Sequence, residues 1–432
     1  MLHRPDYSRW EQLLNITLPK WVRVQRLLPS PEQLDVTAAV RRELYNPDIR
    51  QYLQPGLKVA IGVGSRGIAS LSALVTTTVA AIKEAGCHPF IVPAMGSHGG
   101  ATAVGQLKLL AEYGITEEAV GASIRSSLEV VEIGRLRNGV PVYFDKLALS
   151  ADLLIPINRI KPHTSFRGPI ESGVIKMLVI GFGKHTGATA LHKEGYTSFS
   201  QRLLEALDIV RGKTPFRFGL GVVEDSHNQI ALVKAIPAEV LPERETELLK
   251  LARQLMPRLQ FNYLDVLVVG CVGKDISGMG MDPNITGRFT TNIEGELKAN
   301  KIVVLDLTFG TCGNAVGLGM ADVTTERVLH KLDLDATWIN ALTSTLLQSV
   351  RIPVFMLNDR QAIQLAVKTC NCADSAQVRI AWIHNTRDLE TIYVSEALWS
   401  DIAIQSEFIQ SGELEAVPFD SMGNLKWNMV DS

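Results

Sequence analysis

Imidazole and cationic side chains gather in one glycine-rich stretch of the chain, residues 158–192. A solvated loop rarely joins so many hydrogen-bond donors to an apolar run such as VIKMLVIGF, so the stretch is predicted to carry function. Imidazoles suit proton transfer near neutral pH, and a guanidinium such as that of Arg167 is a candidate for binding a substrate anion. The stretch contains Arg159, Lys161, His163, Arg167, Lys176, Lys184, His185 and His192.

Lys176 lies inside the apolar run, between Ile175 and Met177. A lysine in apolar surroundings is costly unless its charge is paired, neutralised or hydrogen-bonded. This makes Lys176 a candidate for covalent or other functional chemistry. The alternative is a lysine on an amphipathic element whose charged end reaches solvent.

Two shorter glycine-rich loops each follow a strand-like run and precede a helical one. The first, residues 62–67, reads GVGSRG. Glycines let the backbone approach a ligand, and the helix N-terminus beyond them favours an anion, so Arg66 is a candidate for binding a carboxylate. The alternative is a plain turn with a solvated arginine.

The second loop, residues 95–102, reads MGSHGGAT. Ligands of open α/β sheets bind beyond the carboxyl ends of strands, which is where this loop is expected. His98, flanked by glycine, has room for a substrate and is predicted to exchange protons with it, with Ser97 as a neighbouring substrate contact. The alternative is that Ser97 caps the next helix and His98 is merely exposed.

Alternating strand and helix patterns position these loops. In the first third of the chain they predict a βαβ arrangement, which is typical of an α/β fold with a largely parallel sheet. The predicted strands are 58–63, 89–93, 130–133, 140–144, 152–157, 216–223, 230–236, 266–269, 302–305, 353–357, 379–383 and 391–394. The predicted helices are 70–85, 101–113, 196–210, 241–255 and 337–347.

We expect two α/β lobes with an active-site cleft between them. The helical run 241–255 is followed by Pro257, and a strand pattern restarts beyond Asn262. Residues 1–260 are therefore predicted to form an N-terminal domain that carries the chemistry. Residues 261–432 are predicted to form a C-terminal domain that closes the cleft.

Two loops of the second domain also hold polar groups that could bind a ligand. Lys274 and Arg288 could bind phosphate or a second substrate carboxylate, although Lys274 could equally pair with Asp275. Asn314, in the run TCGNA, could contact a substrate hydroxyl or simply make a turn.

Composition excludes several classes of protein. The net charge is −2, so nothing favours nucleic acid or an anionic membrane as a partner. No apolar run is long enough to span a bilayer, the N-terminus lacks a secretory pattern, and the 5 cysteines suggest reduced thiols, which together predict a cytoplasmic protein. Cys370 and Cys372 could bind a metal, but two separate thiols are the simpler interpretation because no second pair stands nearby.

The motif KPH, followed by a glycine-rich stretch, a lysine in an apolar run and a later histidine, resembles the nickel-pincer-nucleotide-dependent lactate racemase family. The resemblance implies a 2-hydroxy-acid racemase or epimerase that works by reversible hydride transfer between C2 and the cofactor. It implies that His98 and His163 are the acid/base pair and that Lys176 holds the cofactor through a thioamide. It also implies that His192 ligates nickel, that Arg66 holds the substrate carboxylate, and that cofactor-biosynthesis enzymes are partners.

The resemblance is best over about residues 60–195, and the spacings both support and limit it. Lys176 and His192 are 16 residues apart, as in the family, whereas the 13 residues from His163 to Lys176 are more than the family has. Val63 stands where an acidic residue is usual, and Lys184 and His185 are rivals for the lysine and ligand roles. These departures indicate a divergent branch with a different substrate.

Two other functions fit parts of the pattern. A nicotinamide-dependent hydroxy-acid dehydrogenase would suit the α/β turns, but GVGSRG is not a clear dinucleotide fingerprint and no acidic ribose partner follows it. A non-catalytic anion- or nucleotide-binding homologue is the other alternative. The joint presence of the four carried-over residues, His98, His163, Lys176 and His192, argues against it.

Overall fold

The computed structural model describes residues 6–427 apart from 29, 30, 32 and 66. The chain forms two compact units. The first unit is Pro29–Met256, and the second combines Met1–Leu28 with Pro257–Ser432.

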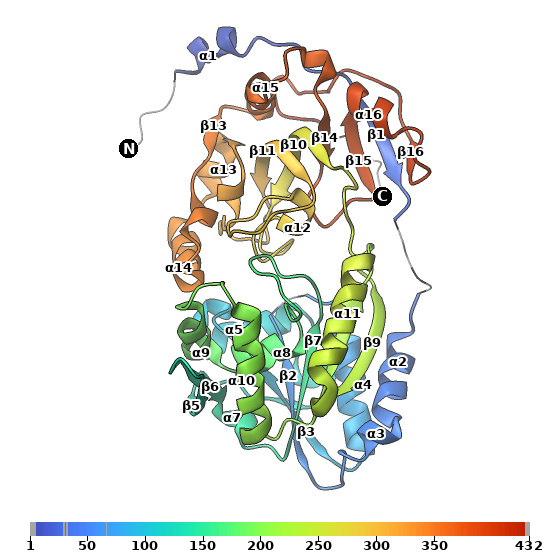
Figure 1. Ribbon diagram of the computed structural model, residues 1–432, viewed down its shortest axis with the longest axis vertical. Helices are drawn as coiled ribbons and strands as arrows, with labels where there is room; N and C mark the ends of the chain where they lie inside the picture. Colours follow the sequence, from blue (N-terminus) through green and yellow to red (C-terminus); the bar gives the residue numbers. More distant parts are fainter. Residues whose placement is uncertain (1–5, 29–30, 32, 66, 428–432) are drawn as a thin grey trace. The chain divides into compact units, whose positions relative to one another are not determined.

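A six-stranded sheet with the order β4-β3-β2-β7-β8-β9 forms the centre of the first unit (Figure 1). Its strands are parallel except for β9, which runs antiparallel to β8. The sequence-based prediction of a largely parallel sheet is therefore confirmed. The strands are β2 (Lys58–Val63), β3 (His88–Pro93), β4 (Ser123–Ile124), β7 (Leu153–Arg159), β8 (Phe218–Glu224) and β9 (Ile230–Pro237).

The first unit also contains an antiparallel hairpin of β5 (Val130–Arg135) and β6 (Pro141–Asp145). A π-helix, Met177–Gly181, directly follows α8. The α-helices of this unit are α2 (Val36–Tyr45), α3 (Pro47–Arg50), α4 (Leu71–Glu84), α5 (Ala103–Glu112), α6 (Glu117–Val120), α7 (Lys146–Leu149), α8 (Val174–Lys176), α9 (Lys184–His192), α10 (Phe199–Lys213) and α11 (Leu241–Leu255).

Both faces of this sheet are buried. Successive side chains of a strand point to opposite faces, so Val59 and Ile61 of β2 share one core with residues of α2 and α4, whereas Ala60 shares the other with residues of α8 and α10. This two-sided burial explains why β2 is almost continuously apolar. It also fixes the loops at the sheet's carboxyl edge between two helical layers.

The second unit contains an eight-stranded sheet with the order β13-β12-β11-β10-β14-β15-β1-β16. The run from β13 to β14 is parallel, and β15, β1 and β16 add antiparallel strands at one side. The strands are β1 (Trp21–Arg26), β10 (Tyr263–Val272), β11 (Lys298–Leu307), β12 (Val323–Thr325), β13 (Val354–Met356), β14 (Ile380–Ile383), β15 (Thr391–Ser395) and β16 (Phe408–Gln410). The α-helices are α1 (Tyr7–Leu13), α12 (Pro283–Thr286), α13 (Glu326–Lys331), α14 (Leu334–Ser344), α15 (Asp359–Thr369) and α16 (Glu396–Ile402).

The N-terminal segment differs from the sequence-based division of the chain. Residues before Pro29 were assigned there to the first domain, but β1 pairs with β15 and β16 of the second unit. Trp21 of β1 has no exposed surface and stacks on Tyr393 at 4.1 Å between ring centroids. Burial of this large aromatic side chain explains why the segment joins a distant part of the sequence. Within the described residues, no helix is both long and apolar enough to cross a bilayer.

Candidate functional site

The predicted chemistry-bearing loops meet at the carboxyl edge of the first unit's sheet. Strand β2 lies between β3 and β7 and is parallel to both, so the loops that follow these three strands leave the same edge. The backbone N–H of Gly96, after β3, donates to the carbonyl oxygen of Gly181 at 3.0 Å. The His98 loop therefore packs against the π-helix that follows Lys176.

His98 is held through its ring nitrogen Nδ1. The hydroxyl of Ser65, in the loop after β2, contacts this nitrogen, and the phenol of Tyr113 donates to the Ser65 carbonyl oxygen at 3.1 Å. Thr102, not Ser97, caps α5, because its hydroxyl accepts from the Gly105 N–H at 3.0 Å. The capping alternative for Ser97 is therefore wrong, and Arg66, from the neighbouring loop, lies outside the described residues.

His163 and Lys176 are in direct contact. The Lys176 Nζ lies 2.7 Å from His163 Nε2, while His163 Nδ1 accepts from the backbone N–H of Ser165 at 3.0 Å. Burial, and then the charge of Lys176, lower the pKa of His163 well below 6.5, so the ring is neutral at neutral pH. The Lys176 Nζ and His163 Nε2 contact is a hydrogen bond whose donor is set by the tautomer of the ring.

His192 belongs to the same cluster, at the end of α9. Its ring stacks on Phe199 with 5.5 Å between centroids, and Tyr196 lies 5.8 Å away. Burial, followed by the charges of Lys176 and Arg202, lowers the pKa of His192 to about 4. Its Nδ1 is buried and has no hydrogen-bond partner among the described residues. A buried, neutral imidazole nitrogen without a partner is the donor that a metal ion needs.

A buried carboxylate fixes the His163 loop. Glu171, 1% exposed, accepts from the backbone N–H groups of His163 at 2.6 Å and Gly168 at 3.2 Å, and it pairs with Arg253. Arg167, a predicted substrate-binding residue, donates to the His163 carbonyl oxygen at 2.6 Å and lies 3.5 Å from Glu171. These contacts give Arg167 a part in shaping the loop. Glu171 was not predicted as a site residue, although it is the one carboxylate of the cationic stretch 158–192, which is a signal in the sequence.

A second buried carboxylate, Glu245 of α11, holds the helix that carries Lys176. It accepts from the Ile175 backbone N–H at 3.1 Å, and burial raises its pKa to about 8. A Cβ at Gly173 would lie 2.3 Å from Glu245 Oε1, so only glycine allows this approach. Asn158, at the end of β7, donates to the Gly173 carbonyl oxygen at 2.6 Å. Nothing in the local sequence pointed to Glu245, because it lies on an ordinary amphipathic helix.

The rivals of Lys176 and His192 are placed differently. Lys184 has no exposed side-chain surface and pairs with Asp145, whose Oδ2 lies 2.9 Å from Nζ. His185 is exposed on α9. The described residues contain no group of three or more His, Cys, Asp or Glu side chains arranged for a metal ion. Cys370 and Cys372 each contact a backbone carbonyl oxygen, of Val367 and Asp374 respectively.

The three predicted residues of the second unit make contacts within that unit. Lys274 Nζ donates to the Gly278 carbonyl oxygen at 2.7 Å. Asn314 donates to the Ala336 carbonyl oxygen at 3.1 Å and accepts from the Val316 N–H at 3.2 Å, which is the turn-forming alternative.

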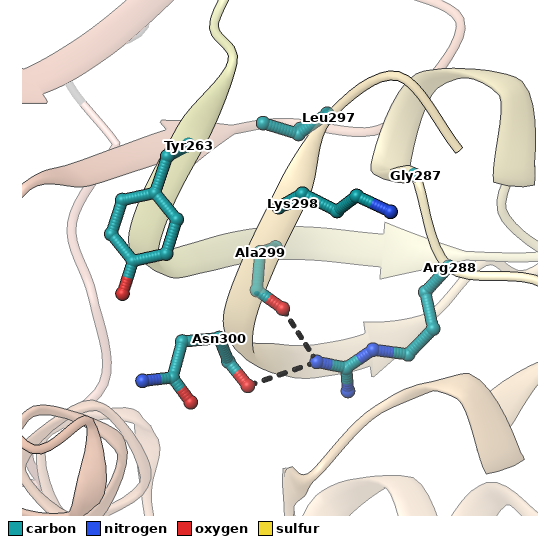
Figure 2. A pocket seen from close by; sticks show the side chains of 7 residues that line it. All are labelled: Tyr263, Gly287, Arg288, Leu297, Lys298, Ala299 and Asn300. Atoms are coloured by element: carbon teal, nitrogen blue, oxygen red, sulfur yellow. Dashed lines mark hydrogen bonds between the residues drawn. The ribbon is translucent and has the colours of Figure 1, made fainter. Parts of the chain in front are cut away.

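Arg288 lies near the residues that begin β10 and β11, whereas Lys274 follows the end of β10. Its guanidinium donates to the carbonyl oxygens of Ala299 at 2.7 Å and Asn300 at 3.0 Å, near the start of β11 (Figure 2), and pairs with Asp322. It lines a hollow of about 410 Å³ with Tyr263, Gly287, Leu297, Lys298, Ala299 and Asn300. Lys274 follows the opposite end of β10, so the two cations do not form one anion site.

The fold and the site together define an α/β protein whose imidazoles and a contacting lysine meet at the carboxyl edge of a parallel sheet. Residues 7–202 match the family model of the lactate racemase N-terminal domain. The chain is therefore lactate-racemase-like over this stretch, as the motifs predicted, and this supports an isomerase of the racemase or epimerase type.

Two solved structures are similar to the chain at low sequence identity. One is the lactate racemase apoprotein from Thermoanaerobacterium thermosaccharolyticum, with 16% identity, a TM-score of 0.48, and coverage of 78% of this chain and 87% of that one. The other is a structural-genomics crystal structure of a protein from Thermotoga maritima, with 13% identity, a TM-score of 0.49, and coverage of 62% and 69%. No curated protein sequence matches the chain.

Proposed function

We propose that the protein is an isomerase that inverts C2 of a 2-hydroxy acid, with His98 and His163 as its acid/base pair. The observation that carries the proposal is the cluster formed by His163, Lys176 and His192, in which Lys176 Nζ lies 2.7 Å from an imidazole nitrogen. Structural side chains rarely combine an amine, a neutral imidazole and a second, unpartnered imidazole nitrogen in one buried place.

The strand order supports proton exchange from two sides. The loops that carry His98 and His163 flank the loop after β2, because β2 lies between β3 and β7. Inversion of a carbinol carbon in both directions needs an acid/base group for each face of the substrate. Histidines in the two loops that flank the β2 loop support this arrangement. In this proposal Arg66 and Ser97, in the same loops, contact the substrate carboxylate and hydroxyl.

The residues present fit the nickel-pincer nucleotide that the family resemblance implies. Lys176 would hold it covalently, and the buried Nδ1 of His192 would ligate the nickel, for which imidazole is a suitable ligand. When bound, this group would supply the hydride acceptor that oxidation of a carbinol carbon requires. Lysine acts as a nucleophile in its unprotonated form, and the imidazole of His163, 2.7 Å from Nζ, is placed to take up the proton that the amine must lose.

Aromatic rings pack against the histidines of this cluster. Phe166 lies 4.3 Å from the His163 ring, and Tyr196 and Phe199 lie beside His192. Burial raises the pKa of Tyr196 to about 12, so its phenol stays neutral and adds no negative charge beside the imidazoles. Aromatic packing of this kind reduces the contact of a site with water, which strengthens the electrostatic contacts inside it.

The test is co-expression of the full chain with the cofactor-biosynthesis enzymes, followed by chiral chromatography of single-enantiomer 2-hydroxy acids. The panel contains lactate and acids with aromatic, dicarboxylic and polyol side chains. We expect conversion of at least one acid to a mixture of both configurations at C2, and loss of this activity in His163→Gln. A nickel-loaded chain that interconverts none of these acids, or a fully active His163→Gln variant, would contradict the proposal.

A further inference from the structure

Lys184 combines two unfavourable features at one position. It begins α9 in the left-handed backbone region, with φ 54°, and its charged side chain has no exposed surface. A left-handed residue other than glycine and a buried ammonium group each cost free energy. A residue that merely started a helix would need neither, so the contacts of Lys184 indicate what it does.

The Lys184 amine joins three elements around the His98 loop. Its Nζ lies 2.9 Å from Asp145 Oδ2 at the end of β6, and it also donates to the carbonyl oxygen of Pro93 and, at 3.4 Å, to Gln106 Oε1. Pro93 ends β3, and Gln106 lies in α5. The amine therefore holds both ends of the loop that contains His98.

Gln106 extends this network to the middle of the loop. Its side chain has no exposed surface, and Nε2 donates to the carbonyl oxygens of Gly96 at 3.1 Å and His98 at 3.3 Å. One amide group therefore holds the backbone on both sides of Ser97.

The contact with Lys184 also fixes the orientation of the Gln106 side-chain amide. An ammonium group has donors only, so Gln106 Oε1 must face Nζ, and the Nε2 hydrogens must then face the two loop carbonyls. A neutral side chain at position 184 that both accepts and donates hydrogen bonds would allow the Gln106 amide to flip, so that its oxygen and nitrogen exchange places. Burial lowers the pKa of Lys184, and the Asp145 carboxylate, 2.9 Å from Nζ, opposes this shift by favouring the ammonium form.

We propose that Lys184 and Gln106 are positioning residues for His98. They hold the loop backbone so that the imidazole keeps the orientation given by its contact with Ser65. Neither residue touches the substrate in this account. The proposal rests on the proposed function only in naming His98 as a proton-exchanging group.

The test uses the full chain labelled with ¹³C and ¹⁵N at histidine, without any ligand. His98→Gln assigns the ring signals of His98. Gln106→Glu keeps the shape and the oxygen that faces Lys184 but removes both amide donors. The double variant Lys184→Met/Asp145→Leu replaces the ion pair with apolar side chains. It provides the test if Gln106→Glu does not fold. Thr78→Val is the control. It removes a buried hydrogen bond within α4, to the Leu74 carbonyl oxygen at 2.7 Å, that involves no residue of the His98 loop.

We expect the His98 ring signals to shift or broaden in Gln106→Glu and in the double variant, and to stay unchanged in Thr78→Val. In the cofactor-loaded enzyme assayed with lactate or the best acid of the panel, kcat should fall about tenfold to a hundredfold, with KM within about twofold, because only orientation is lost. Unchanged His98 signals in a folded Gln106→Glu variant would overturn the proposal. Because the spectra need no turnover, an inactive wild type would refute the proposed function without touching this result.

Discussion

Two neighbouring segments of the first unit each contain a lysine that is at least partly buried, and the two lysines have different partners. In the segment around α8, Lys176 is half-buried and its amine meets an imidazole nitrogen of His163. At the start of α9, Lys184 is completely enclosed and its amine meets the carboxylate of Asp145. A carboxylate favours the ammonium form through its opposite charge, whereas a neutral imidazole does not.

The different partners of Lys176 and Lys184 indicate different roles for the two residues. A lysine amine beside imidazoles can pass its proton to one of them and then act as a nucleophile, so the α8 segment suits covalent attachment. A charged amine among fully buried acceptors is inert and rigid, so the α9 segment suits positioning. Proximity in sequence made these lysines rivals, and their partners distinguish them.

The largest expected effect is on the rate of the catalytic step. His98→Gln and His163→Gln should each lower kcat by about 10²–10⁴-fold, the usual contribution of a positioned acid/base group. The nickel content and the covalent adduct should persist, because neither histidine is the attachment point or the proposed metal ligand. Steady-state kinetics with metal analysis of the same preparation checks this. Wild-type kcat in either variant would remove that histidine from the mechanism.

The next effect concerns the ion pair on the Lys184 side. Asp145→Ala leaves a buried ammonium without its carboxylate and should lower the free energy of unfolding by about 3–5 kcal/mol. Urea unfolding measures the loss. Lys146→Ala is the matched control, because it breaks the exposed pair with Glu129, whose atoms are 2.8 Å apart against 2.9 Å for the Lys184 pair, and should change little. Equal losses in the two variants would show that burial of the Lys184 pair is unimportant.

A smaller effect is expected where α8 begins. Gly173→Ala would place a Cβ 2.3 Å from Glu245 Oε1 and should cost about 1–3 kcal/mol of unfolding free energy through overpacking. Gly212→Ala in α10 meets nothing within 4 Å and should be neutral or slightly stabilising. Thermal and urea unfolding of both variants give the comparison. A neutral Gly173→Ala would mean that Glu245 does not hold the Lys176 helix closely.

The most gradual effect is a dependence of stability on pH. Burial raises the pKa of Glu245 from 4.5 to about 8, so the folded state keeps a proton that the unfolded state loses first. The stability contributed by this group is therefore complete below 4.5 and is lost as pH rises toward 8, at up to about 1.4 kcal/mol per pH unit. Glu245→Gln should remove this slope. Parallel unfolding curves for both proteins at the two ends of that range would contradict the assignment.

The sequence predicted most of the first unit's fold because its elements carry strong local patterns. The bounds of β2 and α11 agree with the predicted 58–63 and 241–255, since continuous apolar runs and 3.6-residue periodicity are local signals. Strand β1 was missed, and residues 1–28 were placed in the wrong unit. The pairing of β1 with β15 joins residues far apart in sequence, which no local pattern reports.

The site was predictable only where residue type carries the chemistry. His163, Lys176 and His192 were chosen by type, spacing and family resemblance, and the structure brings them together. Glu171 and Glu245 were missed, because a carboxylate that accepts from backbone N–H groups has no sequence signature. The sequence marked Lys184 as a candidate but did not predict its role, because that role depends on contacts with Asp145 and Gln106 from other elements.

The most direct test of the account is where the cofactor attaches. The chain is co-expressed with the cofactor-biosynthesis enzymes, and its intact mass, a peptide map and its nickel content are measured beside those of Lys176→Ala and Lys184→Met. We predict a covalent adduct on Lys176 with nickel close to one per chain, its absence in Lys176→Ala, and its persistence in Lys184→Met. An adduct on Lys184, or an unmodified wild-type chain that still racemises a hydroxy acid, would contradict the central claim.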